Sequence, residues 1–295
     1  MHVFLLKRGQ ILLNLQSLIK ERLSMQKRIL IVSQEVSPYI SSQGIADGVL
    51  DLAKIVKKNP GAEVRLMMPK YGCVNERRHQ LHEVIRLSGV NIVVNDIDQP
   101  LIVKVASVPQ ARLQVYFIDN DEYFEKKLVL HKTNNTLIED NDERMMFFCR
   151  GVLETLQMLG WSPNIIHCHG WFTSLIPLYL KTIYANHPVF ESTNIISSFY
   201  EQTLKGTLNK KLVDKIEFDG IDKSTIEGLA KPNAENLHKI AAQFSDGIIV
   251  EDKNVNNIIT EYATQTGNPV LQMEVEGNNK EYYKFYQNFF SEALV

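Results

Sequence analysis

The stretch ILIVSQEVSPYISSQGIADGVLDLAKIV, residues 29–56, decides the fold of this chain. It opens with four consecutive apolar residues, a run typical of a parallel strand that is buried on both faces. A polar loop containing Pro38 and Gly44 follows. Apolar residues then recur every three or four positions from Asp47 to Val56, which predicts an amphipathic helix. Strand, loop and helix form the first half of a β-α-β unit, so we expect the loop to form one wall of any ligand site.

The rest of the chain repeats this alternation. Further apolar runs of strand length lie at 62–68, 165–168, 193–199 and 247–250. Helical periodicity is found at 144–159, 173–185 and 236–244. Residues 82–118 are short β-rich runs, which we interpret as a meander inserted into or appended to the sheet, and 201–234 reads as a charged surface excursion. The pattern predicts an α/β fold, a Rossmann-like parallel sheet with helices on both faces and a β-rich insertion.

Composition narrows the class of protein. The 295 residues are 44% hydrophobic and 22% charged with a formal net charge of −2, which is typical of a globular protein and argues against a nucleic-acid partner. The three cysteines, Cys73, Cys149 and Cys168, have no metal-type or redox spacing, and we expect reduced thiols in a cytoplasmic protein. No apolar run approaches the ~20 residues that span a bilayer, so we expect no membrane partner.

Three segments are expected along the chain. Residues 1–27 form an N-terminal extension, for which a weakly ordered segment is preferred over a membrane-surface helix, and Met25 is an alternative start. Residues 28–265 form the Rossmann-like domain. Residues 266–295 form a tail with an aromatic end, YYKFYQNFF, which we expect to be helical and packed back on the domain or on a second copy of the chain.

Three loops follow three predicted strands and should meet at one edge of the sheet: 33–47, 167–174 and 197–202. In the second loop, His167 and His169 are two residues apart on an extended segment and share a face. A metal pair is one interpretation, but no third ligand is near in the sequence, so we expect no metal and a structural or substrate-contacting role. Trp171 is either a core residue or a platform for a sugar ring, and core packing is favoured.

The first loop carries Glu35, Ser41, Ser42 and Asp47. It matches neither the dinucleotide fingerprint nor a Walker loop. Glu35 is a candidate base or hydroxyl-binding carboxylate, whereas Asp47 is also explained as a cap of its helix.

The same segments carry a family resemblance. SQEVSPYISSQGIADGVLDLA resembles the N-terminal signature S-E-x-x-P-x-x-K-x-G-G-L-A-D-V of bacterial glycogen synthases and plant starch synthases. The matching positions are Glu35, Pro38, Gly44, Ile45, Ala46 and Asp47. MMPKYG (67–72), DNDERMMFFCRGVLE (140–154), PNIIHCHGWFTSLIPLYLK (163–181) and FSDGIIVEDKNV (244–255) resemble later blocks of that family, in the same order.

The resemblance implies a GT-B glycosyltransferase, of which this chain covers the N-terminal half. Such enzymes transfer glucose from ADP-glucose to the non-reducing end of an α-1,4-glucan, so glucan and ADP-glucose are the implied partners. No cofactor is implied, and the expected protein partner is either a second copy of this chain in a homo-oligomer or a separate chain that supplies the C-terminal domain. The candidate substrate-binding residues are Glu35, Ser41, Gly44, Asp47, His167, His169 and Trp171.

Departures from the family pattern affect the chemistry. Ser41-Ser42-Gln43-Gly44 replaces K-x-G-G, so the lysine that binds the donor phosphate is missing. Gly170 and Phe172 replace the aspartate and the last histidine of H-x-H-D-W-H, and 197–200 lacks the histidine of T-x-H-N. Because glucosyl transfer needs donors on the departing diphosphate, we expect weak or no activity of the single chain. The alternatives are a non-catalytic glucan- or nucleotide-binding, regulatory relative and an unrelated small-ligand Rossmann protein.

Overall fold

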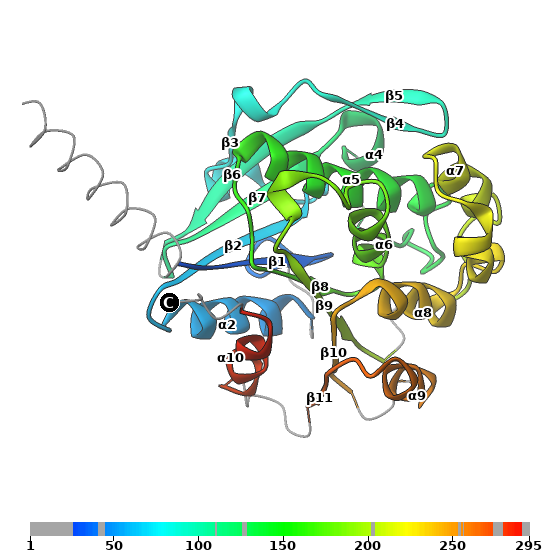
Figure 1. Cartoon of the computed structure of the whole chain (residues 1–295). Coiled ribbons are helices and arrows are strands. Elements are labelled where there is room, and N and C mark those ends of the chain that lie inside the picture. Colours follow the sequence, from blue (N-terminus) through cyan, green and yellow to red (C-terminus); the bar gives the residue numbers. More distant parts are fainter. Residues whose placement is uncertain are drawn as a thin grey trace, which may run out of the picture.

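The computed structural model describes residues 26–40, 45–109, 111–125, 129–201, 204–252, 255, 257–273 and 280–290. A twisted sheet runs through the molecule and helices lie on both of its faces (Figure 1). None of the helices in these ranges is long and apolar enough to cross a membrane. The α/β class and the parallel Rossmann-like sheet predicted from the apolar runs are confirmed.

The main sheet of the described part has nine strands. Their spatial order is β11 (Val270–Gln272), β10 (Gly247–Val250), β9 (Asn194–Phe199), β8 (Ile165–His169), β1 (Lys27–Ser33), β2 (Ala62–Pro69), β7 (Leu113–Asp119), β6 (Ile102–Val108) and β3 (His82–Glu83). Pairing is parallel from β11 to β7, and antiparallel between β7 and β6 and between β6 and β3. β4 (Asn91–Val94) and β5 (Ile97–Pro100) form a separate hairpin.

The order of the strands reverses between β1 and β8. From β1 the chain proceeds outward through β2 to β7, and it then returns to the other side of β1 and continues outward through β8, β9 and β10. At such a reversal, the loops that follow the two neighbouring strands run in opposite directions and leave a crevice between them. Open α/β sheets bind their ligands in this crevice. The loops after β1 and β8 are the two that meet there.

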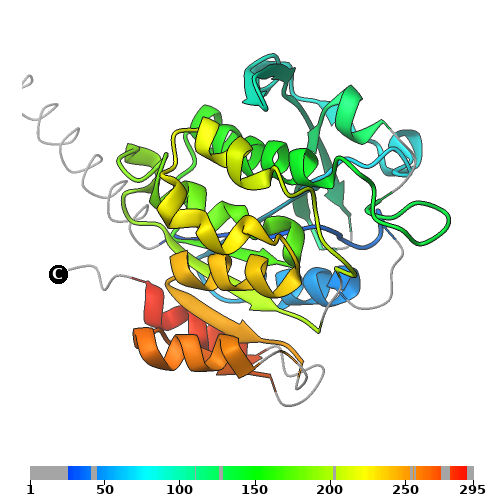
Figure 2. The same ribbon diagram turned by 90° about the vertical axis from the view of Figure 1, so that its right-hand side faces the viewer.

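Helices cover both faces of the sheet. On one face α2 (Ile45–Lys57) packs against α10 (Lys280–Tyr286), and on the other α5 (Asn141–Leu159) packs against α6 (Leu175–Lys181). The remaining helices are α3 (Glu76–His79), α4 (Asp121–Phe124), α7 (Leu212–Phe218), α8 (Ala234–Phe244) and α9 (Asn257–Thr266). The 3-10 turns are η1 (Ile85–Leu87), η2 (Trp171–Thr173), η3 (Pro188–Phe190), η4 (Lys223–Ala230) and η5 (Gln287–Phe289). In Figure 2, α9 and α10 lie at the opposite end of the molecule from the β4–β5 hairpin.

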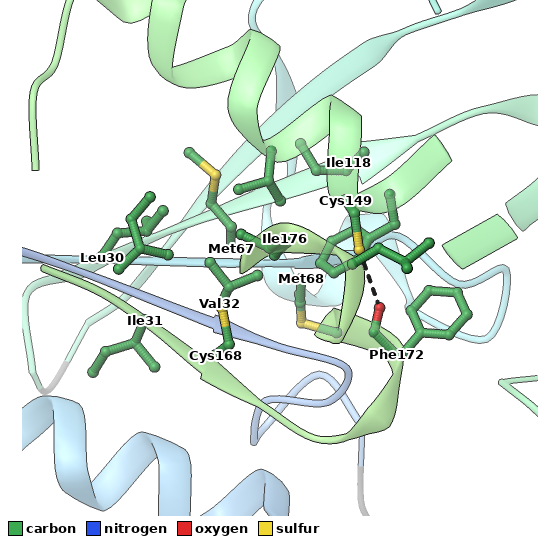
Figure 3. Close-up of a cluster of buried hydrophobic side chains, with 14 of the residues drawn as sticks. Leu30, Ile31, Val32, Met67, Met68, Ile118, Cys149, Cys168, Phe172 and Ile176 are labelled. Atoms are coloured by element: carbon green, nitrogen blue, oxygen red, sulfur yellow. Dashed lines mark hydrogen bonds between the residues drawn. The ribbon is translucent and has the colours of Figure 1, made fainter. Parts of the chain in front are cut away.

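The core follows from the alternation of side chains along the central strands. Leu30 and Val32 of β1 point to the α5 side of the sheet, whereas Ile31 points toward α2 (Figure 3). All four residues of the 29–32 run have no exposed surface. The apolar stripe of α2 is also buried and its exposed face carries Asp47 and Asp51, which is why this sequence forms an amphipathic helix on a fully buried strand.

Two expectations about irregular regions need correction. The last run of the expected meander, β7, pairs in parallel with β2 and is an integral strand of the main sheet. The segment 201–234 is more than a charged surface excursion, because α7 and η4 lie within it and bury the apolar residues Leu212, Ile216, Ile226 and Leu229. These residues recur at helical spacing, but the lysines and aspartates between them masked the pattern.

The tail contributes α10 and η5, and β11 extends the sheet as far as Gln272. Phe285, Tyr286 and Phe289 are buried, and the Phe289 carbonyl accepts a hydrogen bond from Asn194 Nδ2 at 2.9 Å. The candidate residues Ser41 and Gly44, and the expected extension up to residue 25, lie outside the described residues.

Candidate functional site

The three predicted site loops do meet at one edge of the sheet. β1, β8 and β9 are adjacent and parallel, with Ser33 opposite His169 and His169 opposite Ser198. The first two loops are also joined directly, because Gln34 N–H donates to the His169 carbonyl at 3.4 Å. The loops therefore form one continuous edge at the reversal of strand order.

Glu35 and Asp47 lie at this edge with solvent access. Glu35 is half-buried, and its backbone is anchored by Ser33, whose hydroxyl donates to the Glu35 carbonyl at 2.7 Å. Burial raises the pKa of the Tyr71 hydroxyl well above its ordinary value, and the Glu35 carboxylate raises it further. The Arg144 guanidinium acts in the opposite direction. Asp47 is exposed within the first turn of α2, beyond the cap position, where its charge complements the helix dipole.

His167 and His169 do not reach solvent. They are 0% and 1% exposed, and both side chains point to the face of the sheet that carries α10. A chain of polar contacts encloses them. His167 Nε2 lies 2.7 Å from Ser198 Oγ, and His167 Nδ1 lies 2.6 Å from Tyr286 OH. His169 Nδ1 lies 2.7 Å from Tyr200 OH. The two rings also contact each other, with His169 Nε2 3.1 Å from His167 Nδ1.

Glu251, which follows β10, completes this polar cluster. Its Oε1 accepts from Ser198 Oγ at 2.5 Å, and its other oxygen accepts from Tyr282 OH of α10. Burial lowers the pKa of His169 to about 3 and the pKa of His167 well below its ordinary value, with a contribution to the latter from His169. Burial also raises the pKa of the Glu251 carboxyl, against the two hydroxyl donors. Both imidazoles are therefore neutral near pH 7.

Trp171 is part of the core. It is 1% exposed, and its ring meets Phe172 edge to face with the centroids 5.3 Å apart. Its indole N–H has no hydrogen-bond partner among the described residues. The expectation of core packing is confirmed, and the face of the ring is covered in this arrangement.

Carboxylates lie along this edge in the part of the chain that the structure describes. Glu35, Asp47, Glu201 and Asp252 all follow or flank the carboxyl ends of the parallel strands. The lysine after β2, Lys70, is 12% exposed in its side chain and forms an ion pair with Glu76 at 2.7 Å. Repulsion from these carboxylates disfavours a diphosphate here, whereas hydroxyl groups are good partners for them.

Comparison with known proteins places these residues in a family. The model of the "Starch synthase catalytic domain" family matches residues 28–273, which is most of the chain. The chain belongs to the starch synthase catalytic domain family. This membership confirms the resemblance carried by the loop after β1 and by the His167-x-His169 segment.

Individual relatives agree with the family. The chain is 38% identical over 211 residues to a glycogen synthase of Chlorobium phaeobacteroides, covering 70% of this chain and 42% of that protein. It is 39% identical over 190 residues to a glycogen synthase of Chlorobium limicola, covering 64% of this chain and 39% of that protein. The chain thus spans about two fifths of the length of these curated relatives.

A solved structure shows the same fold. The catalytic domain of Starch Synthase IV from Arabidopsis thaliana, bound to ADP and acarbose, superposes with a TM-score of 0.69. The match covers 84% of this chain and 51% of that chain at 19% identity. The fold of this chain is therefore that of a starch synthase catalytic domain.

Gly170 shows how this starch synthase domain accommodates its departure from the family motif. It adopts φ 83° and ψ 159°, a region that is essentially restricted to glycine. A Cβ at this position would lie 2.5 Å from Gln34 Oε1, the atom that accepts from Phe172 N–H at 3.4 Å. The Gln34 carboxamide thus fills the space beside residue 170 and links the two loops.

The sequence-based interpretation missed part of the cluster around the histidines. Glu251 directly follows the apolar run 247–250, so the rule that joined the other three loops would have included it. Tyr282 and Tyr286 are four residues apart on one face of α10, a spacing that is visible in the sequence. The sequence does not indicate that this face of α10 packs against β8.

Proposed function

We propose that this chain is a glucan-binding domain of the glycogen and starch synthase type, a class of proteins whose substrates are α-1,4-glucan and ADP-glucose. We also propose that the single chain transfers glucose weakly or not at all. Family membership supports the substrate class.

One observation carries the second part of the proposal. The described edge of the sheet presents carboxylates where a sugar nucleotide would need positive charge, and its lysine, Lys70, is held by Glu76. The histidine side chains that the motif retains are sealed under α10 and have no free donor directed at the edge. A departing diphosphate develops negative charge, and neighbouring carboxylates do not stabilise that charge.

The carboxylates favour a different ligand chemistry. Glu35 accepts hydrogen bonds and is half-exposed, which suits the hydroxyl groups of a glucan chain. Glucan binding at this edge is therefore compatible with the loss of the transfer step.

The test combines turnover and binding on the same preparation. We expect little or no incorporation of glucose from radiolabelled ADP-glucose into glycogen above the heat-inactivated protein, together with measurable binding of maltoheptaose by calorimetry. Glu35→Gln should weaken maltoheptaose binding by about 1 kcal/mol or more, because a charged acceptor is replaced by a neutral one. Glu83→Gln, at an exposed carboxylate on the far edge strand β3, is the matched control and should bind as the parent does.

Turnover comparable to that of a full-length glycogen synthase assayed in parallel would contradict the proposed loss of activity. Absence of both glucan and ADP-glucose binding would contradict the proposed substrate class and favour an unrelated ligand.

A further inference from the structure

The cluster at the ends of β8 and β10 has a property that the proposed function does not use. One donor atom from each of His167, His169 and Glu251 lies within 4.8 Å of the other two. His167 and His169 are two residues apart in the sequence, and Glu251 follows His169 by 82 residues. Only folding brings the three side chains together. The expectation of no metal rested on the lack of a third ligand nearby, and the fold supplies one.

The two imidazoles are oriented in the way that metal-bound histidines are. His167 directs Nε2 to Ser198 Oγ at 2.7 Å, and His169 directs Nδ1 to Tyr200 OH at 2.7 Å. A histidine ligand almost always uses its second nitrogen to contact an oxygen in this way, which sets its tautomer and direction. The remaining two nitrogens, His167 Nδ1 and His169 Nε2, then face each other at 3.1 Å.

Proton counting shows that these side chains do not satisfy one another fully. His167 Nδ1 lies 2.6 Å from Tyr286 OH as well as 3.1 Å from His169 Nε2. A neutral imidazole nitrogen offers either one N–H or one lone pair in its plane. In either tautomer of His167 a single site must therefore serve two partners, which leaves one contact poorly made in a buried region.

We propose that His167, His169 and Glu251 form a binding site for a divalent transition-metal ion of the zinc class. A cation between the facing nitrogens uses both lone pairs at once and accepts the carboxylate as its third ligand. The Tyr286 hydroxyl oxygen lies 2.6 Å from His167 Nδ1, so it must move outward from this nitrogen to become the fourth ligand.

The geometry favours zinc over the harder cations. Zn–N bonds of about 2.0–2.1 Å place two ligands of a tetrahedron roughly 3.3 Å apart, close to the distance between the facing nitrogens. The Glu251 oxygen lies within 4.8 Å of both nitrogens, so it must move inward by up to about 1.5 Å to complete this geometry. Two imidazoles and one carboxylate are a ligand set that Zn²⁺ prefers, whereas Mg²⁺ and Ca²⁺ require oxygen ligands.

The site links three separated parts of the chain. Its ligands belong to β8 and to the loop after β10, and Tyr282 and Tyr286 of α10 contact Glu251 and His167. An ion here would hold the tail helix against the sheet. Its role is structural, since every ligand side chain lies on the side of the sheet that α10 covers.

The experiment uses the full chain without an affinity tag of histidines. After dialysis against a chelator, Zn²⁺ is titrated in competition with a fluorescent zinc indicator, metal content is measured by mass spectrometry, and Co²⁺ replaces Zn²⁺ for visible spectroscopy. We expect one Zn²⁺ per chain, a tetrahedral Co²⁺ spectrum and a higher melting temperature with Zn²⁺.

Four variants separate a built site from general histidine binding. His169→Gln and Glu251→Gln each remove a ligand and should weaken Zn²⁺ binding by about 100-fold or more, whereas Tyr200→Phe keeps all ligands and should weaken it by roughly 10-fold. His82→Gln, at an exposed histidine on β3, should leave the Zn²⁺ affinity unchanged.

Substoichiometric metal in the parent chain, or equal Zn²⁺ affinity of the parent and a folded Glu251→Gln chain, would overturn the proposal. Both outcomes are independent of glucan binding.

Discussion

At the scale of single residues, the junction of the loops after β1 and β8 depends on a glycine. Gly170 has a positive φ and no room for a Cβ, because the Gln34 side chain occupies that space. The sequence identified Gly170 as a departure from the family motif, but it did not identify Gln34 as the side chain that fills the gap. The two residues are 136 positions apart and meet only because β1 and β8 are neighbours.

We expect Gly170→Ala to lower the free energy of unfolding by roughly 2–4 kcal/mol, from backbone strain plus overlap with Gln34. The double variant Gln34→Ala/Gly170→Ala should recover part of this loss, because the overlap is removed and the strain remains. Urea unfolding measures both.

Gly48→Ala is the matched control. Gly48 is exposed within α2 with no atom within 4 Å of the added Cβ, so alanine should stabilise the protein by about 0.5–1 kcal/mol through helix propensity. Equal stability of Gly170→Ala and the parent would show that the junction is not constrained as described.

A second residue-scale prediction concerns acid stability. The His238 ring packs edge to face on Phe199 with centroids 5.1 Å apart, and burial lowers its pKa to about 4. The unfolded chain therefore binds more protons than the folded one below the ordinary pKa of 6.5, so stability falls as the pH falls from 6.5 toward 4. Between pH 7 and 5 this residue should account for at most about 2 kcal/mol of the loss.

The measurement is urea unfolding of the parent and His238→Gln at pH 7, 6 and 5. The variant should show a shallower loss of stability, while His82→Gln, at an exposed position, should follow the parent. Parallel pH profiles of His238→Gln and the parent would contradict the assignment.

At the scale of elements, α7 shows why the segment 201–234 was misjudged. Lys215 gives this helix the appearance of a solvated surface, but its ammonium group is buried between Asp142 and Glu143 at the start of α5, at 2.6 Å from each. Charged residues in a sequence predict exposure on average. Only the packing of α7 near α5 makes this lysine an internal ion-pair partner.

Lys215→Ala should destabilise the protein by about 3–5 kcal/mol, because two carboxylates would be left without their buried cation. Chemical unfolding of the parent and the variant at pH 7 measures this loss of stability. The comparison is Lys223→Ala, whose ammonium group also contacts two carboxylates but is 55% exposed, and whose loss should be within the error of the same experiment. Equal losses for the two variants would show that burial of the pair does not control its contribution.

At the scale of the whole molecule, stability should decrease from the centre of the sheet to its edges. β1 and β8 are central, and five of the seven residues of β1 and all five of β8 are buried. β3 and β11 lie at the two ends of the strand order, and none of their residues is fully buried. Central strands open only when the domain unfolds, and edge strands open locally.

Hydrogen exchange followed by mass spectrometry should therefore show the slowest exchange for peptides covering β1 and β8. Peptides covering β3 and β11 should exchange faster by several orders of magnitude, through local opening. Uniform protection across the sheet would contradict this gradient.

The sequence by itself determined the fold class, the family and the loops that meet at the reversal between β1 and β8. These features follow from local patterns, because a buried run such as 29–32 followed by an amphipathic helix is visible in the sequence. Parallel strands bring their carboxyl ends together wherever such units repeat.

Tertiary structure alone decided what surrounds the histidines. His167 meets Tyr286 across 119 positions and Ser198 meets Glu251 across 53, and the register of strands and the docking of α10 create those contacts. Short-range periodicity holds no information on which distant faces pack together, so the loop after β1 could be placed from sequence and the enclosed cluster beside it could not.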